Sequence, residues 1–353
     1  MPKNKKNNLG LLKMEAPSEL RFDLISGDWV VIATGRARRP ETFKKEKREK
    51  EEVSKKLCPF CNINNQEEPT LIYSKGKKVL FKLGKEVPKN WTTVVIPNKY
   101  PAFVPYLKLE KKSENHLFQR MNAVGFHEVV ITRDHKKSLA HMSISRVKEV
   151  IDVFQARFKE MANEKFVNYV SIFHNHGAEA GATITHPHSQ IVTTPLIDSD
   201  LKKALVNSRN YLSKNKQCIY CRMMEWEKKN RERIVFENEN FLAVCPFASK
   251  SAFEVIISPK KHLSYFEKIT EKEKIHLAEA LHIVLKKLYK GLNNPAYNFY
   301  LHTAPCDGNK HDYYHWHWTI LPKTSTWAGF EIGTKIEIST IEPEKAAEFL
   351  RKQ

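Results

Sequence analysis

Hydrophobic residues recur every three or four positions in two long segments of the chain, which is the spacing of one face of an α-helix. In residues 145–164 this stripe consists of Val147, Ile151, Phe154 and Phe158. Residues 270–289 carry a second stripe, and Thr270 with Glu273 has the spacing of a capping box at its start. The pattern predicts one long amphipathic helix in each half of the chain.

Short runs rich in β-branched and aromatic residues, bounded by polar and turn residues, lie on both sides of each helix and predict strands. These runs fall at 19–32 (two strands joined by a turn), 91–103, 126–135, 167–175, 240–247, 252–262, 297–303 and 315–322. Further helices are expected over 198–214 and from Pro343 onward. Strands with one long helix per half predict an α+β fold with a mainly antiparallel sheet.

The order of these elements occurs twice, which indicates a duplication. FHEVVITRDH, ending at His135, matches AFEVIISPKKH, ending at His262, and each half also has a C-x-x-C pair, a helix and an H-x-H segment. The predicted organisation is a disordered, basic N-terminus at 1–17, a first half at 18–197 and a second half at 198–353.

Composition narrows the class of protein. Hydrophobic residues make up 41% of the 353 residues, and no apolar run approaches the length of a membrane span. The basic N-terminus lacks the apolar core of a secretory signal, so a cytoplasmic protein without a membrane partner is expected. The net charge of +19 suits a phosphate-bearing substrate or a lysine-rich solvated surface. No nucleic-acid-binding motif is present, and no nucleic-acid partner is expected.

Four of the six cysteines form two C-x-x-C pairs, which in a large cytosolic chain indicate metal or redox chemistry. Zinc takes four ligands near a tetrahedron, and two thiolates with two imidazoles are a common set. The first half offers Cys58, Cys61, His135 and His186, and the second half offers Cys218, Cys221, His262 and His315. The repeat of the whole set predicts two zinc sites per chain.

Alternatives to metal binding remain open from the residues alone. A redox C-x-x-C needs a helix that opens at the first cysteine, whereas both pairs here are expected at strand or turn starts. Buried thiols without an ion are another reading. At the second site His311 competes with His315, which is preferred because its place in the repeat matches that of His186.

The segment HPHSQ at 186–190 combines two histidines with a glutamine. Side chains alternate along an extended chain, so His186, His188 and Gln190 point to one face. If His186 binds metal, His188 is left as a neutral imidazole that can attack phosphate, with Gln190 donating to phosphate oxygens. Just upstream, Gly177 and Gly181 would let backbone N–H groups approach the same phosphate.

The second half keeps the H-x-H pair but not the glutamine. His317 is followed by Trp318 and Thr319. Only the first half is therefore predicted to be catalytic, and the second half is predicted to be structural.

HPHSQ after FHNHGAEAGATIT, with GRARRP at 35–40 and GFE at 329–331, resembles galactose-1-phosphate uridylyltransferases of the histidine-triad superfamily, from about Glu19 to Leu350. The resemblance implies a duplicated histidine-triad fold in a homodimer whose active site lies at the subunit boundary. It implies ping-pong transfer of a nucleoside monophosphate from a nucleotide sugar to a sugar 1-phosphate, with His188 carrying the nucleotidyl group and Gln190 steadying the phosphate.

The resemblance also implies substrate contacts. These fall on Arg36 and Arg39 near the phosphates, Asn98 near the nucleoside, Asn175 and Thr183 near the nucleophile, and Glu331 at the hexose. The two cysteine–histidine sets match the family's zinc site and a second metal site that varies between branches. Ser325 stands where some members carry lysine.

The expected reaction is therefore galactose 1-phosphate plus UDP-glucose to UDP-galactose plus glucose 1-phosphate. Relatives with HPHSQ also include enzymes that use ADP-glucose and phosphate, so a phosphorylase of ADP-glucose or of a diadenosine polyphosphate is the alternative. A zinc-stabilised nucleic-acid-binding protein is a third reading, which leaves Gln190 and the difference between the halves unexplained.

Overall fold

The computed structural model describes residues 18–33, 43, 54–82, 84–106 and 108–353. The N-terminal segment predicted to be disordered lies outside the described residues, as do Arg36 and Arg39.

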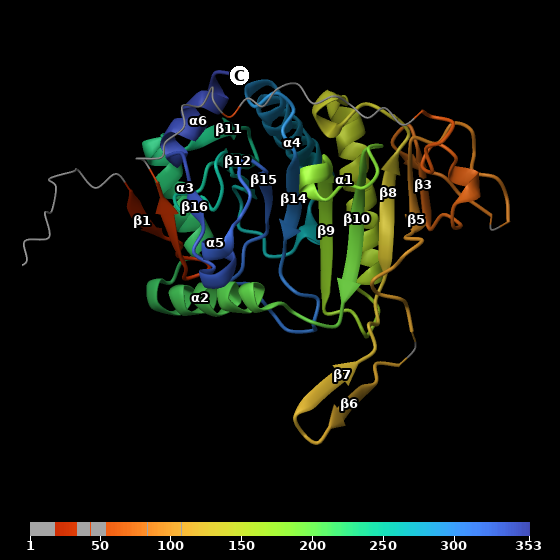
Figure 1. Ribbon diagram of the computed structural model, residues 1–353, viewed down its shortest axis with the longest axis horizontal. Helices are drawn as coiled ribbons and strands as arrows, with labels where there is room; N and C mark the ends of the chain where they lie inside the picture. Colours follow the sequence, from red (N-terminus) through yellow and green to blue (C-terminus); the bar gives the residue numbers. More distant parts are fainter. Residues whose placement is uncertain (1–17, 34–42, 44–53, 83, 107) are drawn as a thin grey trace, which may run out of the picture.

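A single eleven-stranded sheet forms the centre of the molecule (Figure 1). Its order is β11-β12-β13-β15-β14-β9-β10-β8-β5-β3-β4, and every neighbouring pair is antiparallel. The strands are β3 Leu71–Ser74, β4 Lys77–Lys78, β5 Thr93–Pro97, β8 His127–Thr132, β9 Tyr169–His176, β10 His188–Thr194, β11 Ile234–Glu237, β12 Phe241–Val244, β13 Val255–Pro259, β14 Tyr297–His302 and β15 His317–Pro322. The predicted antiparallel sheet is confirmed.

Ten of the eleven strands form two copies of one order, β3-β5-β8-β10-β9 and β11-β12-β13-β15-β14, and β4 is added at the edge beside β3. The copies meet where β9 pairs with β14, with Asn175 opposite Asn298. Register repeats as well, because Gln190 lies opposite Val129 in the first copy and Thr319 lies opposite Ile256 in the second. The duplicated fold is thereby confirmed, and the registers identify equivalent residues in the two halves.

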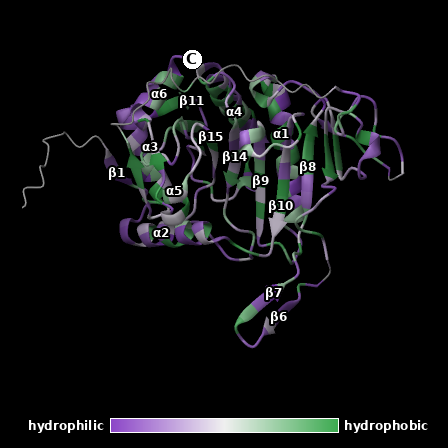
Figure 2. Cartoon of the chain, in the orientation of Figure 1, coloured by the Kyte–Doolittle hydropathy of each residue, from purple (hydrophilic) through white to green (hydrophobic). Residues whose placement is uncertain are grey.

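One long helix per half covers the same face of this sheet. The helices α1 (Ile144–Met161) and α4 (Glu271–Gly291) pack against each other and against strands of their own halves. The predicted capping box of Thr270 and Glu273 is present at the start of α4. Figure 2 shows hydrophobic residues along the central strands, and the alternate residues that face the helices form the main core.

The remaining elements lie at the edges. A small sheet joins β1 (Glu19–Phe22), β2 (Trp29–Ile32) and β16 (Ile338–Ser339), and a hairpin of β6 (Lys111–Glu114) and β7 (Phe118–Met121) projects from the body (Figure 1). The other helices are α2 Ser199–Asn215, α3 Ile219–Asn230, α5 Gly329–Thr334 and α6 Pro343–Arg351, with short 3-10 segments at Ile63–Asn65, Leu139–His141, Ala178–Ala180 and Phe266–Lys268. None of the helices in the described ranges is long and apolar enough to cross a membrane.

The expected position of the second C-x-x-C at a strand or turn start is wrong. Cys218 is the N-cap of α3, and Cys221 lies in the first turn of that helix. The segment after Cys218 is rich in Met, Glu and Lys, which favour helix, and it buries Ile219, Tyr220 and Met224 on one side.

Candidate active site and metal centres

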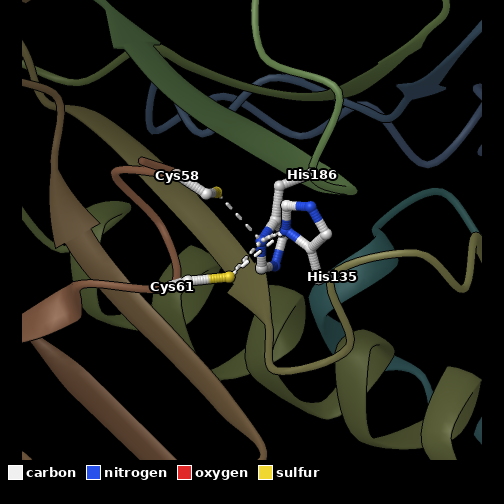
Figure 3. A group of neighbouring side chains, drawn as sticks. All are labelled: Cys58, Cys61, His135 and His186. Carbon is white, nitrogen blue, oxygen red and sulfur yellow. Dashed lines mark hydrogen bonds between the residues drawn. The ribbon is translucent and has the colours of Figure 1, made fainter. Parts of the chain in front are cut away.

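The four residues of the first predicted metal set converge on one point (Figure 3). Cys58 and Cys61 lie on the loop before β3, His135 follows β8, and His186 precedes β10. His186 Nδ1 lies 3.5 Å from Cys58 Sγ, 3.6 Å from Cys61 Sγ and 3.3 Å from His135 Nδ1. Cys61 Sγ lies 3.2 Å from His135 Nδ1.

These distances fit a tetrahedral ion. Zinc bound at about 2.3 Å from sulfur and about 2.05 Å from nitrogen would hold a sulfur and a nitrogen ligand about 3.6 Å apart and two nitrogens about 3.3 Å apart. The Nε2–H group of His186 donates to the carbonyl of Thr132 at 2.6 Å, which leaves the Nδ1 lone pair toward the thiols. Burial lowers the pKa of His186 to about 4, so the ring is neutral, as metal binding requires.

The second set repeats this arrangement. The ligand atoms of Cys218, Cys221, His262 and His315 all lie within 4.8 Å of one another, as do those of the first set. His315 Nε2 donates to the carbonyl of Pro259 at 2.9 Å, and Pro259 is the repeat equivalent of Thr132. Hydrogen bonds from Cys221 and from the imidazoles of His262 and His315 lower the pKa of the Cys218 thiol. The shared geometry fits zinc in both halves.

The alternative ligand His311 is turned away from this cluster. Its Nε2 lies 2.9 Å from Asp307 and its Nδ1 lies 2.9 Å from the Tyr313 hydroxyl, so both ring nitrogens have other partners. The geometry favours His315 over His311. The second C-x-x-C does open a helix at Cys218, as a redox pair requires. However, His262 Nδ1 and His315 Nδ1 both face the Cys221 thiol, at 3.5 and 3.6 Å, and this four-residue arrangement fits metal binding better.

His188 is the first residue of β10 and lies on the sheet face opposite α1 and α4. Its Nδ1–H group donates to the carbonyl of His186 at 2.9 Å, so Nε2 carries the free lone pair. Burial lowers the pKa of His188, which keeps that lone pair unprotonated at neutral pH. The edge of Phe60, from the loop between Cys58 and Cys61, packs against this ring at 5.0 Å and against His186 at 5.9 Å. A neutral, oriented imidazole of this kind can act as a nucleophile.

Gln190 lies on the same sheet face as His188, because side chains two residues apart on a strand point to the same side. We call this face, opposite α1 and α4, the open face. Its Oε1 lies 2.7 Å from the Nε2 of His127, the first residue of β8. His127 in turn lies against Asn98, at 3.0 Å between Nε2 and Nδ2, and accepts from the Ala102 amide at 3.1 Å. His127 was not among the predicted site residues, because only the register of β8 against β10 places it on the face of Gln190.

A residue of the second half is hydrogen-bonded to the loop between β9 and β10 of the first half. Asn298 of β14 donates to the Asn175 side chain and to the carbonyl of Ala180, both at 2.8 Å. Gly177 and Gly181 flank this 3-10 segment at φ values of 84° and 86°, where glycine is favoured. Asn298 was not among the predicted site residues, because its partner Asn175 lies across the junction between the halves.

Other predicted substrate residues have distinct positions. Asn98 is partly buried at the end of β5, and Thr183 is exposed on the loop before β10. Glu331 caps α5 by accepting from the backbone N–H of Ala328 at 3.0 Å. Figure 1 shows α5 beside α2 and β16 in the second half, apart from β10. In this view the helix that carries Glu331 and the strand that begins with His188 are separate.

Two hollows lie on either side of β10 in strand order. A cavity of about 650 Å³ is lined by Asn98, Pro101, Phe103, Phe126 and His127 among others, at the ends of β5 and β8. A second of about 450 Å³ lies over β9 and β14 and is lined in part by Phe173, Asn175, Asn298, Tyr300, Lys323 and Trp327. Both volumes lie in the range of small-molecule sites.

Comparisons with known proteins agree with this geometry. The family descriptions "Galactose-1-phosphate uridyl transferase, N-terminal domain" and "C-terminal domain" match residues 11–197 and 204–352. The chain is 31% identical to an ADP-glucose phosphorylase of Arabidopsis thaliana over 95% of this chain and 92% of that protein. It is 27% identical to a galactose-1-phosphate uridylyltransferase of Thermotoga maritima, covering 95% of this chain and 98% of that protein.

Solved structures give the same result. A crystal structure of the Arabidopsis thaliana ADP-glucose phosphorylase with bound ADP-glucose has a TM-score of 0.76 at 29% identity and covers 95% of this chain and 99% of that one. A structure titled "Structure of uridylyltransferase" has a TM-score of 0.71 at 26% identity and covers 94% and 97%. The chain therefore belongs to the galactose-1-phosphate uridyl transferase family and is a nucleotidyltransferase.

Proposed function

We propose that this protein transfers a uridylyl group from UDP-glucose to galactose 1-phosphate, forming UDP-galactose and glucose 1-phosphate. The observation that carries the proposal is His188, whose Nδ1–H group is held by the His186 carbonyl so that Nε2 faces the open side of the sheet beside Gln190. Family membership supports the reaction class, and the Thermotoga maritima relative bears the name of this enzyme.

The chemistry proceeds in two displacements. His188 Nε2 attacks the phosphorus next to the nucleoside, a nitrogen–phosphorus bond forms, and the bond to the sugar phosphate oxygen breaks to release glucose 1-phosphate. A phosphate oxygen of galactose 1-phosphate then attacks the same phosphorus and the nitrogen–phosphorus bond breaks. The Nδ1 proton stays on the ring throughout, where its bond to the His186 carbonyl stabilises the positive charge of the intermediate.

Hydrogen-bond donors would stabilise the negative charge that develops on the phosphate oxygens. We assign this role to the Gln190 amide nitrogen, whose Oε1 is held by His127, and to the backbone N–H groups of the Gly177–Gly181 loop. Asn175 orients that loop through Asn298, and Thr183, Arg36 and Arg39 are further proposed phosphate contacts.

The two hollows supply room for the two ends of a nucleotide sugar. We place the nucleoside in the cavity that contains Asn98, and the sugar phosphate over β9 and β14, where Lys323 offers a cation. Each hollow is one or two strands away from His188 in the sheet order.

We propose zinc as the metal of both cysteine–histidine sets. With four protein ligands each, both sites would be closed and structural, so the ion ties loops together and does not bind substrate. At the first site this fixes the backbone on both sides of Pro187, which sets the direction of His188.

A homodimer in the cytoplasm is part of this proposal. The hexose contact predicted at Glu331 is capping its own helix, away from β10 in the same chain. A second copy of the chain could bring its Glu331 to the open face beside His188. Light scattering and a mixed dimer of His188→Ala and Glu331→Gln chains would test this. Restoration of one of the two active sites per mixed dimer, about half of the wild-type activity, is expected only if the two residues come from different chains.

ADP-glucose is the second candidate donor, with phosphate as acceptor. The observation that favours it is the 31% identity to the Arabidopsis thaliana ADP-glucose phosphorylase across nearly the whole chain. The chemistry at His188 is the same for both donors, and a diadenosine polyphosphate would deliver the same adenylyl group.

The test is a donor and acceptor matrix. UDP-glucose and ADP-glucose are each mixed with galactose 1-phosphate or inorganic phosphate, and glucose 1-phosphate release is followed. Rapid release with UDP-glucose and galactose 1-phosphate supports the proposal, whereas release confined to ADP-glucose with phosphate selects the second candidate. Absence of release from every pair refutes both.

A further inference from the structure

His127 lies at the start of β8, between two residues proposed to contact the two ends of the nucleotide. Strand register places His127 opposite Val192 and Gln190 opposite Val129, so His127 and Gln190 are diagonal neighbours on the open face. This approach of the strands is tight, because a Cβ on Gly125 would lie 2.2 Å from the carbonyl oxygen of Thr193. The backbone thus holds the His127 ring against the Gln190 side chain.

Hydrogen bonding fixes the tautomer of the His127 ring. The Ala102 backbone N–H can only donate, and it lies 3.1 Å from Nδ1, so Nδ1 is the acceptor nitrogen. In the neutral ring the hydrogen is then on Nε2, which lies 2.7 Å from Gln190 Oε1. The Gln190 carbonyl end is therefore the end that accepts from His127.

This hydrogen bond also determines where the NH2 group of the Gln190 amide points. With Oε1 held by His127, the NH2 group is turned to the remaining side, and within the described residues no side chain or backbone group accepts from it. An amide free to rotate would present oxygen and nitrogen in turn, and oxygen would repel phosphate. One donor bond from His127 removes that ambiguity.

The second half supplies an internal comparison. Register makes Glu254 the equivalent of His127 and Thr319 the equivalent of Gln190. A carboxylate cannot orient an amide oxygen by donating to it, and Glu254 instead accepts from the Lys250 backbone N–H at 2.6 Å. The histidine and the glutamine are therefore both replaced in the half that is predicted to be inactive.

From these observations we infer that His127 is a positioning residue for nucleotidyl transfer, which fixes the Gln190 amide so that its NH2 group faces the phosphate. The inference rests on the proposed function. Asn98 Nδ2 lies beside the same ring nitrogen, at 3.0 Å from His127 Nε2, while Asn98 Oδ1 accepts from the Tyr100 amide at 2.9 Å. In the tautomer set by Ala102 both nitrogens carry hydrogen, so this is a contact and the Nε2–H group donates to Gln190. The same ring therefore links the proposed nucleoside cavity to the proposed phosphate contact.

The test uses two substitutions of His127, each of which keeps a polar nitrogen at the position of only one of the two ring nitrogens. The amide nitrogen of a glutamine at this position can lie where His127 Nε2 lies and donate to Gln190. An asparagine side chain reaches only as far as the position of Nδ1. The rate of glucose 1-phosphate release in a single turnover is measured with UDP-glucose and with ADP-glucose for His127→Gln, His127→Asn, Gln190→Ala and the double variant His127→Asn/Gln190→Ala. Melting temperature and metal content are measured on each protein to check the fold.

His127→Asn is expected to slow the single turnover about 10- to 30-fold, which is the effect of one orienting hydrogen bond. His127→Gln should recover to within about 3-fold of the wild type, and adding His127→Asn to Gln190→Ala should change the rate by less than about 3-fold. Equal losses from His127→Asn with and without Gln190, or no recovery in His127→Gln, would overturn the positioning role. Failure of the wild-type chain to turn over either donor would refute the proposed function instead.

Discussion

The two halves of this chain carry the same H-x-H geometry in different surroundings. His188 and His317 each donate from Nδ1 to the carbonyl of the preceding metal-set histidine, at 2.9 and 3.1 Å. His188 is partly exposed on the open face, but His317 is 6% exposed and stacks on His302 at 4.8 Å, with Tyr220 at 5.4 Å. The local backbone is therefore not what distinguishes a nucleophile from a packed ring.

The two histidines differ in their exposure to solvent and in the polar side chains beside them. Thr319 and Glu254 occupy the places of Gln190 and His127 in the second half. Burial lowers the pKa of His317 well below its usual range, so its ring is neutral like that of His188, yet substrate cannot reach it. Both halves thus keep the cysteine–histidine set, whereas only the first half combines an accessible H-x-H histidine with a polar donor pair.

The largest expected contrast is between the two histidines. His188→Ala removes the proposed nucleophile and should lower turnover by at least about 10³-fold. His317→Ala should leave turnover within about 3-fold, because its ring contacts only protein, but should cost about 1–3 kcal/mol of stability through the cavity left behind. Steady-state rates and thermal unfolding of both variants check this. Equal losses of activity would remove the distinction between the halves.

A smaller contrast is expected at the residue two positions further along each strand. Gln190→Ala should slow glucose 1-phosphate release about 10²- to 10³-fold, since it removes a donor to developing negative charge. Thr319→Ala, at the equivalent position, should change the rate by less than about 3-fold. A single-turnover measurement for both variants provides the comparison, and a Gln190→Ala enzyme with wild-type rate would contradict the assignment of Gln190.

Substitution of a ligand in each of the two metal sets should affect stability in both cases but activity in only one. Cys58→Ser and Cys218→Ser should each lower the metal content by about one ion per chain and lower the melting temperature. Only Cys58→Ser should also slow turnover, by about 10- to 100-fold, because His186 then no longer anchors His188. Elemental analysis and rates on the same preparations test this. Loss of both metals in the Cys218→Ser protein would show that the sites are not independent.

The last contrast concerns stability, at a buried ion pair that only the first half has. Arg157 of α1 makes two hydrogen bonds to Glu128 of β8, at 2.7 and 2.8 Å, where the second half has Val255. Arg157→Met should destabilise the protein by about 3–5 kcal/mol, since it leaves Glu128 buried without its partner. The double variant Glu128→Val/Arg157→Met should recover most of that loss in urea unfolding.

Much of the fold followed from local patterns in the sequence. The apolar stripe of α1, the capping box of Thr270 and Glu273, and β-rich runs such as that of β8 depend on neighbours a few residues apart, and these three predictions are confirmed. The metal sets could be grouped in advance because each one recurs in the same order. The start of α3 at Cys218 was missed because its helical stretch is short and follows directly from the α2 segment.

Contacts that depend on register could not be derived in the same way. His127 touches Gln190 only because β8 and β10 are adjacent and in a particular alignment, and Asn298 reaches Asn175 only across the junction of the two halves. Both distances in sequence are large, and no local pattern marks the partner. Register is set by packing of the whole sheet, which becomes visible only in the folded structure.

The central claim, that one half of this duplicated chain carries the nucleotidyl group on His188, is tested most directly by mapping the covalent intermediate. Wild-type protein is incubated with UDP-glucose or ADP-glucose without acceptor, quenched in alkali because phosphoramidates are acid-labile, and analysed by intact mass and peptide mapping. The account predicts a single nucleotidyl group per chain on the peptide that contains His188, and no modification of His317. An adduct at any other residue, or unmodified protein with both donors, would contradict it.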